Sequence, residues 1–525
     1  MEANSGAASP HILPSLSLRK RKRQSAVTPE NPFLLSPAQS YRGEDGLGIS
    51  RRDMKDMIAL FQQRHVPYIA VFRAQEFQDL DYIIDHEPRF AYAMCYVTAR
   101  YLPGGKEIRE ALLPEVSLIP KDVYTAKVGV HHDDDMCLLK ALTVLYAYAD
   151  LTPPSQAARP SGKENLLYWS LKSAAEMYAF RLSLHRSIQE LKLDMAANSG
   201  NIYTTKSFQR YTYWLFLYSM SHYCSLVTGT PPTMRVDLSI RAISGLLDQL
   251  GRYPEYPTNL FGAVEIYLIW EQTSTAHPQL GEWWCLPDPT ERANEDLTES
   301  LLNEADRAID EWYAKWWPYM SSEPRGSFLD YHGRFTRFCL ASYAIKCLRI
   351  SSEGLTQLQR SQLQRCVSCA NHVLEFPLTR GTIEKDNLRY VDDAACIIVS
   401  FCCVFLLSAC QAFPSELVNV SECLENVTDA ANLMVELAIN QDHKPHYQGS
   451  FLLKRVETLK AALEMSRLHE QHEPNVTDNS DVRLSPAATG ENSKLLLEGF
   501  DQLFHEDGLF GLEPIWDFSM LFPGT

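Results

Sequence analysis

The sequence lacks the features that mark several common classes of protein. None of its 13 cysteines lies before Cys95, so a zinc-thiolate site near the N-terminus would have no ligands. The N-terminal region holds no apolar stretch of the kind found in secretory signals, and we therefore expect an intracellular protein. In a reducing compartment the cysteines are predicted to be small buried apolar side chains rather than disulfides.

Motifs of catalysis are missing as well. The sequence contains no glycine-rich phosphate loop, no G-x-S-x-G and no H-E-x-x-H. Two aspartate pairs, at 133–134 and 392–393, are similar to the magnesium motifs of all-α terpenoid-type synthases. A cysteine, Cys137 or Cys396, stands where each motif needs a third carboxylate. We predict no catalytic residue and no cofactor, and a terpenoid-type enzyme stays as an alternative.

Two other groups of potential metal ligands are better explained by structure. His131 and His132 precede the aspartates 133–135, and adjacent side chains rarely point at one ion, so we interpret this cluster as a solvated helix start. Cys366 and Cys369 lack the second cysteine pair that a zinc site needs, and we expect them in the core. The sequence therefore predicts no metal site.

Basic residues are in the minority. The chain has 49 Lys and Arg against 65 Asp and Glu, a formal charge of −16 and a pI near 5.4. A body this acidic cannot neutralise DNA phosphates along its surface, so any DNA contact must be local or made through another protein. Apolar residues, in contrast, make up 45% of the 525 residues, which is enough to bury a sizeable core.

Apolar residues recur at helical spacing through most of the chain. In the stretch 204–232, Phe208, Tyr211 and Leu215 begin a stripe of the kind that a helix buries on one broad face, and Gly229 with the following prolines ends it. No strand-like alternation and no fixed repeat competes with this pattern. The predicted fold class is all-α, a large multi-helix bundle over residues 51–470.

Two predicted helices raise particular questions. The helix 297–317 is strongly amphipathic and is predicted to end at Pro318, because proline cannot continue a hydrogen-bonded helix. A further helix, 388–410, overlaps the stretch 394–413, which has 20 residues without a charge and is long enough to span a membrane. No Lys or Arg cluster flanks that stretch, and we favour a buried core helix over a membrane span.

Residues 1–50 are rich in Pro, Ser, Ala and Gly, and we expect them to be disordered. A basic run inside this segment resembles a nuclear localisation signal or a phosphate-contacting arm, with a simple solvated charge run as the alternative. The run consists of Arg19, Lys20, Arg21, Lys22 and Arg23.

The C-terminal region is predicted to contain a linker at 471–492 and an acidic-aromatic tail at 493–525. Mixing of acids with bulky side chains keeps aromatic anchors soluble and able to dock on a partner as a short helix. The alternative is a segment packed back on the body. The aromatic residues of the tail are Phe500, Phe504, Phe510, Trp516, Phe518 and Phe522.

Five stretches of the body follow one another in an informative order. An aromatic and His/Pro segment at 61–69 is followed by an apolar helix at 138–149 and by the sequence Arg-Leu-Ser-Leu-His at 181–185. The stretch 204–232 then supplies an arginine, a tryptophan helix and a Gly-Thr-Pro-Pro turn, and 297–317 is rich in Leu and Trp. We call the residues that carry the family comparison made below the marker residues. They are Leu182, Leu184, His185, Arg210, Trp214, Gly229, Pro231 and Pro232.

Together these stretches resemble the middle homology region of fungal binuclear zinc-cluster transcription factors, across residues 53–468. Serine replaces the glycine of the family's Leu-Gly-Leu-His signature, and the arginine of its Gly-Arg-Pro turn is missing. The resemblance implies a nuclear regulator of RNA polymerase II transcription of metabolic genes, with an all-helical regulatory domain at 51–470. It further implies a tail that contacts the transcription machinery or a co-activator, and it allows a homodimer and a small-molecule inducer. No membrane association is expected.

The main departure from that family is the absence of its six-cysteine, two-zinc DNA-binding cluster. Either the chain never had the cluster, or the sequence begins downstream of it. We expect DNA binding by this chain to be weak or indirect. A helical co-regulator without DNA contact, a membrane-anchored regulator and the terpenoid-type enzyme remain as alternatives.

Overall fold

The computed structural model describes residues 49–125, 132–151, 166–197, 201–250, 258–277, 294–322, 326–348, 355–413, 417–440 and 443–472. Contacts divide the chain into two units, Met1–Ser40 and Tyr41–Thr525, and every described residue belongs to the second. The described residues form helices and no strand, which confirms the predicted all-α class. The basic run and the aromatic tail lie outside the described residues, as does the linker apart from its first two residues, Gln471 and His472.

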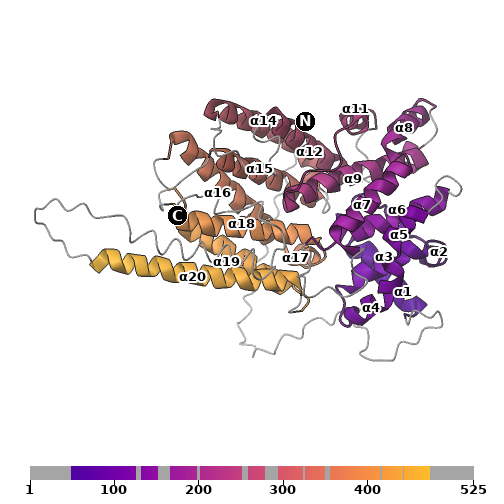
Figure 1. Cartoon of the computed structure of the whole chain (residues 1–525), viewed down its shortest axis with the longest axis horizontal. Helices are drawn as coiled ribbons and strands as arrows, with labels where there is room; N and C mark the ends of the chain where they lie inside the picture. The colour runs from indigo at the N-terminus through magenta and orange to yellow at the C-terminus, as the bar shows by residue number, and fades with distance from the viewer. Residues whose placement is uncertain are drawn as a thin grey trace, which may run out of the picture. The chain divides into compact units, whose positions relative to one another are not determined.

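The first half of the body is a group of short helices packed around α3, which contacts α1, α2, α4 and α6 (Figure 1). Its helices are α1 (Arg51–Arg64), α2 (Leu80–His86), α3 (Pro88–Ala99), α4 (Gly105–Val116), α5 (Ile119–Thr125), α6 (His132–Ala147), α7 (Tyr168–Arg181) and α8 (Ser187–Ala196). Short 3-10 helices connect them: η1 (Val66–Tyr68), η2 (Ala74–Phe77), η5 (Leu184–Arg186) and η6 (Ile202–Thr204).

Helix α9 (Lys206–Thr228) follows this group of helices in the chain and joins it to the helices of the second half, α10 to α20. Thr205 caps its N-terminus by accepting a hydrogen bond from Phe208 N at 3.2 Å, and Gly229 ends it in the left-handed conformation at φ 57°. The sequence predicts the end at Gly229. It predicts one buried face, whereas α9 is buried nearly all round, because α7, α8, α12 and α18 pack against different sides of it.

The following helices are α10 (Leu238–Arg241), α11 (Ile243–Leu250), α12 (Thr258–Ala276), α14 (Glu295–Ser322), α15 (Gly326–Leu348) and α16 (Gln357–Leu378). The prediction that Pro318 ends its helix is wrong, since α14 continues to Ser322. Proline removes one backbone donor and crowds the preceding turn. Only one further turn follows Pro318, so the helix carries this defect close to its end, where few hydrogen bonds remain to be lost.

The last helices are α17 (Thr382–Leu388), α18 (Asp393–Ala412), α19 (Val420–Leu437) and α20 (Lys444–His472). The predicted continuous helix 388–410 is wrong at its start, because the chain leaves α17 at Leu388 and Asp392 begins a new helix as its N-cap. By length and composition α18 could cross a membrane, but 89% of its most apolar window is buried. Helices α9, α16, α19 and α20 cover it, which favours the core-helix interpretation (Figure 1).

The cysteines that the structure describes are free thiols, and nine of these 11 are buried. Burial raises the pKa of Cys366 well above its usual range, and it raises the pKa of Cys369 to about 11. Both stay protonated at neutral pH and behave as apolar side chains. The expectation of core cysteines is confirmed for this part of the chain.

Candidate functional site

The marker residues that follow α7 meet the first half of α9. Arg210 Nη2 donates a hydrogen bond to the carbonyl oxygen of Leu182 at 2.6 Å, and Arg210 Nε lies 3.4 Å from a carboxylate oxygen of Glu190. Leu182 is the last capping residue of α7, so the guanidinium satisfies a carbonyl that the helix leaves open. Arg210 therefore joins the end of α7 to α9.

An aromatic stack extends this contact. The Trp214 ring lies 5.3 Å from Phe180 and 6.0 Å from His185, measured between ring centroids. Only 3% of Trp214 is exposed. Phe180, which packs against it, is itself about half exposed. Leu182 and Leu184 are buried beside them. We call Leu182, Leu184, His185, Arg210 and Trp214 the marker cluster; its contacts are packing and capping rather than a set of reacting groups.

Ser183 has a backbone conformation that favours glycine. Its φ of 57° and ψ of 34° lie in the left-handed region, and it is the one non-glycine residue described with a positive φ. A side chain in that region costs free energy that glycine avoids. The turn from α7 into η5 therefore keeps its shape here despite an unfavourable residue.

The other three marker residues lie elsewhere. Gly229, Pro231 and Pro232 follow the C-terminus of α9, and at 1.5 Å per residue Gly229 is roughly 28 Å along the helix from Arg210. Gly229 N donates to Ser225 O at 2.7 Å, and Thr230 N reaches the same oxygen at 3.3 Å. The eight marker residues thus form two separate structural features at opposite ends of α9.

The clusters weighed as metal sites have structural roles or lie outside the described residues. His131 is not described, and Asp133 to Asp135 fall in the first turn of α6. Within the described ranges, no group of three or more His, Cys, Asp or Glu side chains is arranged to hold a metal ion. Asp392 caps α18 and Asp393 pairs with two cations, as described below.

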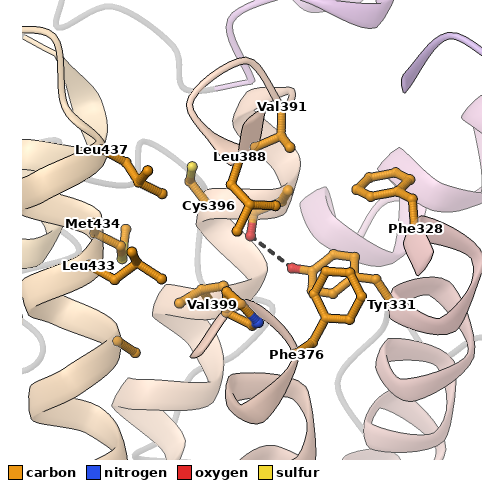
Figure 2. A pocket seen from close by; sticks show the side chains of 13 residues that line it. Phe328, Tyr331, Phe376, Leu388, Val391, Cys396, Val399, Leu433, Met434 and Leu437 are labelled. Carbon is orange, nitrogen blue, oxygen red and sulfur yellow. Dashed lines mark hydrogen bonds between the residues drawn. The ribbon is translucent and has the colours of Figure 1, made fainter. Parts of the chain in front are cut away.

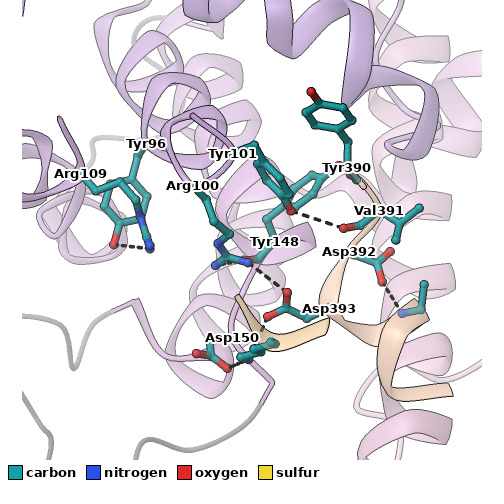
Figure 3. Close-up of polar contacts among 12 residues, drawn as sticks. Tyr96, Arg100, Tyr101, Arg109, Tyr148, Asp150, Tyr390, Val391, Asp392 and Asp393 are labelled. Carbon is teal, nitrogen blue, oxygen red and sulfur yellow. Dashed lines mark hydrogen bonds and ion pairs between the residues drawn. The ribbon is translucent and has the colours of Figure 1, made fainter. Parts of the chain in front are cut away.

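The 387–393 segment, which connects α17 to α18, is a second place where distant parts of the chain meet. Its backbone carbonyls accept hydrogen bonds from tyrosines of the first half, and Arg64 donates to the side chain of Asn387. The tyrosine bonds are Tyr68 to Asn387 O at 3.0 Å, Tyr148 to Tyr390 O at 2.9 Å and Tyr101 to Val391 O at 3.4 Å. Figure 3 shows the last of these. Buried carbonyls need such partners.

The same segment also binds the end of α19. Arg389 Nη1 donates to Leu437 O at 2.9 Å and to Ala438 O at 3.3 Å, which satisfies carbonyls at the C-terminus of that helix. The segment is therefore held by α1, η1, α3 and α6 on one side and by α19 on the other. Any movement of it would change contacts in both halves.

A buried ionic cluster follows at the start of α18. Asp393 Oδ1 lies 3.1 Å from Arg100 Nη1, and its Oδ2 lies 2.9 Å from Lys444 Nζ (Figure 3 shows the arginine pair). Lys444 also pairs with Asp150, and Arg100 Nη2 donates to Tyr148 O at 3.2 Å. Burial raises the pKa of Asp393, but Lys444 and Arg100 more than offset this and bring it to about 2. Asp393 is ionised at neutral pH.

Asp392 has the opposite electrostatic environment. It caps α18 by accepting from Ala395 N at 2.9 Å, and it has no cation of its own among the described contacts. Burial raises its pKa to about 6, and the neighbouring Asp393 contributes to the increase. The pKa values of the two adjacent aspartates are therefore shifted in opposite directions, because Asp393 faces two cations, whereas Asp392 is buried beside the charge of Asp393.

His65 is enclosed by the aromatic residues of this junction. Its ring lies 4.9 Å from Tyr101 and from Tyr148 and 5.4 Å from Tyr390. Burial, with a smaller contribution from Arg100, lowers the pKa of His65 to about 3, so the imidazole is neutral. The His/Pro motif at 61–69 is thus part of the packing between the two halves.

Two adjoining pockets lie beside the 387–393 segment. The first has about 480 Å³ of space, partly open to solvent, between α15, α16, α18 and α19, and its 13 lining residues are apolar apart from the Tyr331 hydroxyl and the Cys396 thiol (Figure 2). The second has about 780 Å³ and is lined by polar side chains from α1, η1 and α17. Phe328, Phe376 and Leu388 line both pockets.

The comparisons with known proteins give one distant relative. The curated protein named "Transcriptional activator of proteases prtT", from Emericella nidulans, is 25% identical to this chain over 236 residues. The match covers 41% of this chain and 33% of that protein, so the chain spans about a third of its relative's length. No family model matches the chain, and no solved structure matches it. The match supports a relationship with fungal transcription factors and, in general terms, a role in transcription regulation.

Proposed function

We propose that this chain is a nuclear regulator of RNA polymerase II transcription of metabolic genes. The observation that carries the proposal is the match to a transcriptional activator, together with the order of the marker motifs along the helical body. The basic run 19–23 would direct the chain to the nucleus, and the acidic-aromatic tail at 493–525 would contact the transcription machinery or a co-activator. Catalysis and a bound cofactor form no part of the proposal.

The helical body would serve as the regulatory domain. Its two halves meet at the 387–393 segment, and such a junction can respond to a bound inducer or to a second copy of the chain if the two arrangements bind it differently. Without zinc ligands, contact with DNA would be weak or would run through another factor. Purified chain that binds DNA with steep salt dependence would favour direct contact, and its absence would favour the co-regulator alternative.

A reporter experiment tests the activation role. Residues 491–525 are fused to an unrelated DNA-binding domain, with Trp516 and Phe518 either intact or replaced together by alanine. We expect the intact fusion to activate the reporter and the double variant to lose most of that activity, because aromatic anchors dominate docking of such segments. His505→Ala is the matched control and should keep activity. Background output from both fusions would remove the assignment.

A further inference from the structure

The two pockets beside the 387–393 segment have complementary chemistry. One offers apolar side chains from four helices, and the other offers guanidinium groups and amides at the edge of the first. They share Phe328, Phe376 and Leu388 as common walls, so the two pockets adjoin.

The apolar pocket favours a hydrocarbon chain over a polar ligand. The hydroxyl of Tyr331 already donates to Ala395 O at 2.9 Å, as Figure 2 shows, and burial keeps the Cys396 thiol protonated by raising its pKa. A polar group placed there would lose its hydrogen bonds to water without finding new partners. Met434, with its flexible thioether, allows the wall to adapt to chains of different shape.

The polar pocket favours a negative charge. The Arg380 guanidinium carbon lies 4.3 Å from the Phe376 ring centroid, which places this cation at the shared wall. Its nearest carboxylate, Asp330, is 4.0 Å away and pairs at 3.0 Å with Arg334 instead. The charge of Arg380 is therefore poorly neutralised by the protein.

Arg64 adds a second cation to this pocket. Its terminal nitrogen contacts Asn387 and lies 3.4 Å from Asp386, but its buried Nε donates to no acceptor in the described residues. The acid that lines the pocket, Glu384, already accepts from Gly381 N at 3.2 Å as part of a helix cap. Among the residues that line the pocket, the two guanidinium groups thus face one carboxylate, that of Glu384, while Asp386 and Asp330 pair with these arginines from outside the lining.

We propose that the two pockets together bind one medium-chain carboxylic acid. Its hydrocarbon chain lies between α15, α16, α18 and α19, and its carboxylate lies beside Arg380 and Arg64, where charge-assisted hydrogen bonds are the strongest available. Such a ligand contacts Leu388 and Val391 of the 387–393 segment, so binding favours one arrangement of the junction. This gives the inducer of the proposed function a site and a chemical class, and its regulatory meaning rests on that function.

Calorimetric titration of the purified full chain tests the binding. Octanoate is expected to bind saturably, 1-octanol to bind about tenfold more weakly, and butyrate not to bind. Arg380→Gln should weaken octanoate about tenfold while leaving 1-octanol unchanged, because one charged contact is worth about that factor. Arg360→Gln, an exposed arginine at the opposite end of α16, is the matched control and should bind like the unchanged chain.

A second variant tests the hydrocarbon end. Ala430→Leu places extra methyl groups into the apolar pocket, and it should abolish binding of octanoate and 1-octanol while lowering the free energy of unfolding by no more than about 1–3 kcal/mol. An octanoate affinity that is unchanged in both the Arg380→Gln and the Ala430→Leu variants would overturn the proposal. The absence of saturable binding would overturn it as well. A peptide of residues 493–525 that binds in an Ala430→Leu-sensitive way, while octanoate does not bind, would assign the pocket to the chain's own tail instead.

These outcomes are separate from those of the reporter fusion. Loss of octanoate binding with an active fusion would reject the ligand and leave the transcription role standing. Octanoate binding with an inactive fusion would support the ligand and reject the activation role of the tail. The titration therefore measures the site itself, independently of any promoter.

Discussion

The marker cluster and the 387–393 junction both join helices that are distant in sequence, but they do so by opposite means. The marker cluster uses aromatic packing, with one arginine capping a helix end. The junction uses tyrosine hydroxyls on backbone carbonyls and a buried aspartate between two cations. Aromatic packing tolerates small changes, whereas buried charges depend on every partner. The first region therefore suits a fixed scaffold, and the second suits a contact that can change state.

Removing the central charge of the junction should give the largest effect. Asp393→Ala leaves Arg100 and Lys444 without their common carboxylate in a largely buried setting. Breaking a buried ion pair on one side costs about 3–5 kcal/mol of unfolding free energy, and denaturant titration would measure it.

The exposed pair of Asp386 with Arg64 supplies the control for that variant. Asp386→Ala removes a carboxylate that is about half exposed, so it should cost less than about 1 kcal/mol. Equal losses from Asp386→Ala and Asp393→Ala would mean that burial does not set the strength of the junction, and the contrast with the marker cluster would disappear.

Asp392→Asn should stabilise the chain at neutral pH. Because the folded pKa of about 6 exceeds the unfolded value of about 3.9, the folded state binds more protons between these values, and the free energy of unfolding rises as pH falls through 6. Asparagine stays neutral and keeps the N-cap. The variant should be more stable by about 2–3 kcal/mol at pH 7.5, and this advantage should vanish near pH 4.

Comparing the variant with the unchanged chain at each pH cancels the titration of other groups. The buried histidines, including His65, have lowered pKa values in the folded chain. The free energy of unfolding therefore decreases as pH falls below about 6.5. That loss is common to both proteins. A difference between the two that stays constant from pH 7.5 to pH 4 would show that Asp392 is ionised in the folded chain throughout.

Next to the marker cluster, Ser183→Gly should give the smallest effect and a favourable one. Glycine adopts a φ of 57° without steric cost, so the unfolding midpoint should rise by an amount equivalent to about 1 kcal/mol. Ser183→Ala is the matched control, because it removes the hydroxyl but keeps the strained conformation. If the alanine variant were stabilised equally, the left-handed backbone would not be the cause.

Much of the fold could be predicted from sequence because local chemistry decides it. Helix α9 is framed by Thr205 and Gly229, and the capping oxygen and the left-handed glycine act within a few residues. The continuation of α14 past Pro318 could not be predicted, since the cost of proline depends on how many helical bonds follow. The start of α18 could have been predicted from sequence, since Asp392 is a favourable N-cap residue directly before a long uncharged stretch.

The site was harder to predict because its partners are far apart. Asp393 meets Arg100 from 293 residues away and Lys444 from 51 residues away, and no periodicity links them. In the sequence, the pair 392–393 was interpreted only as an incomplete magnesium motif. Two adjacent acids before a long uncharged stretch also indicate a helix N-terminus. The marker residues were identified as a set, yet their division between the two ends of α9 needed the structure.

The burial of α18 has a consequence for how the chain is made. Of the helices that cover it, α9 and α16 precede it in the chain, whereas α19 and α20 follow it. At about 5–20 residues per second, part of its apolar surface therefore stays uncovered for several seconds during synthesis. During that interval α18 exposes a surface with the length and apolarity of a membrane span.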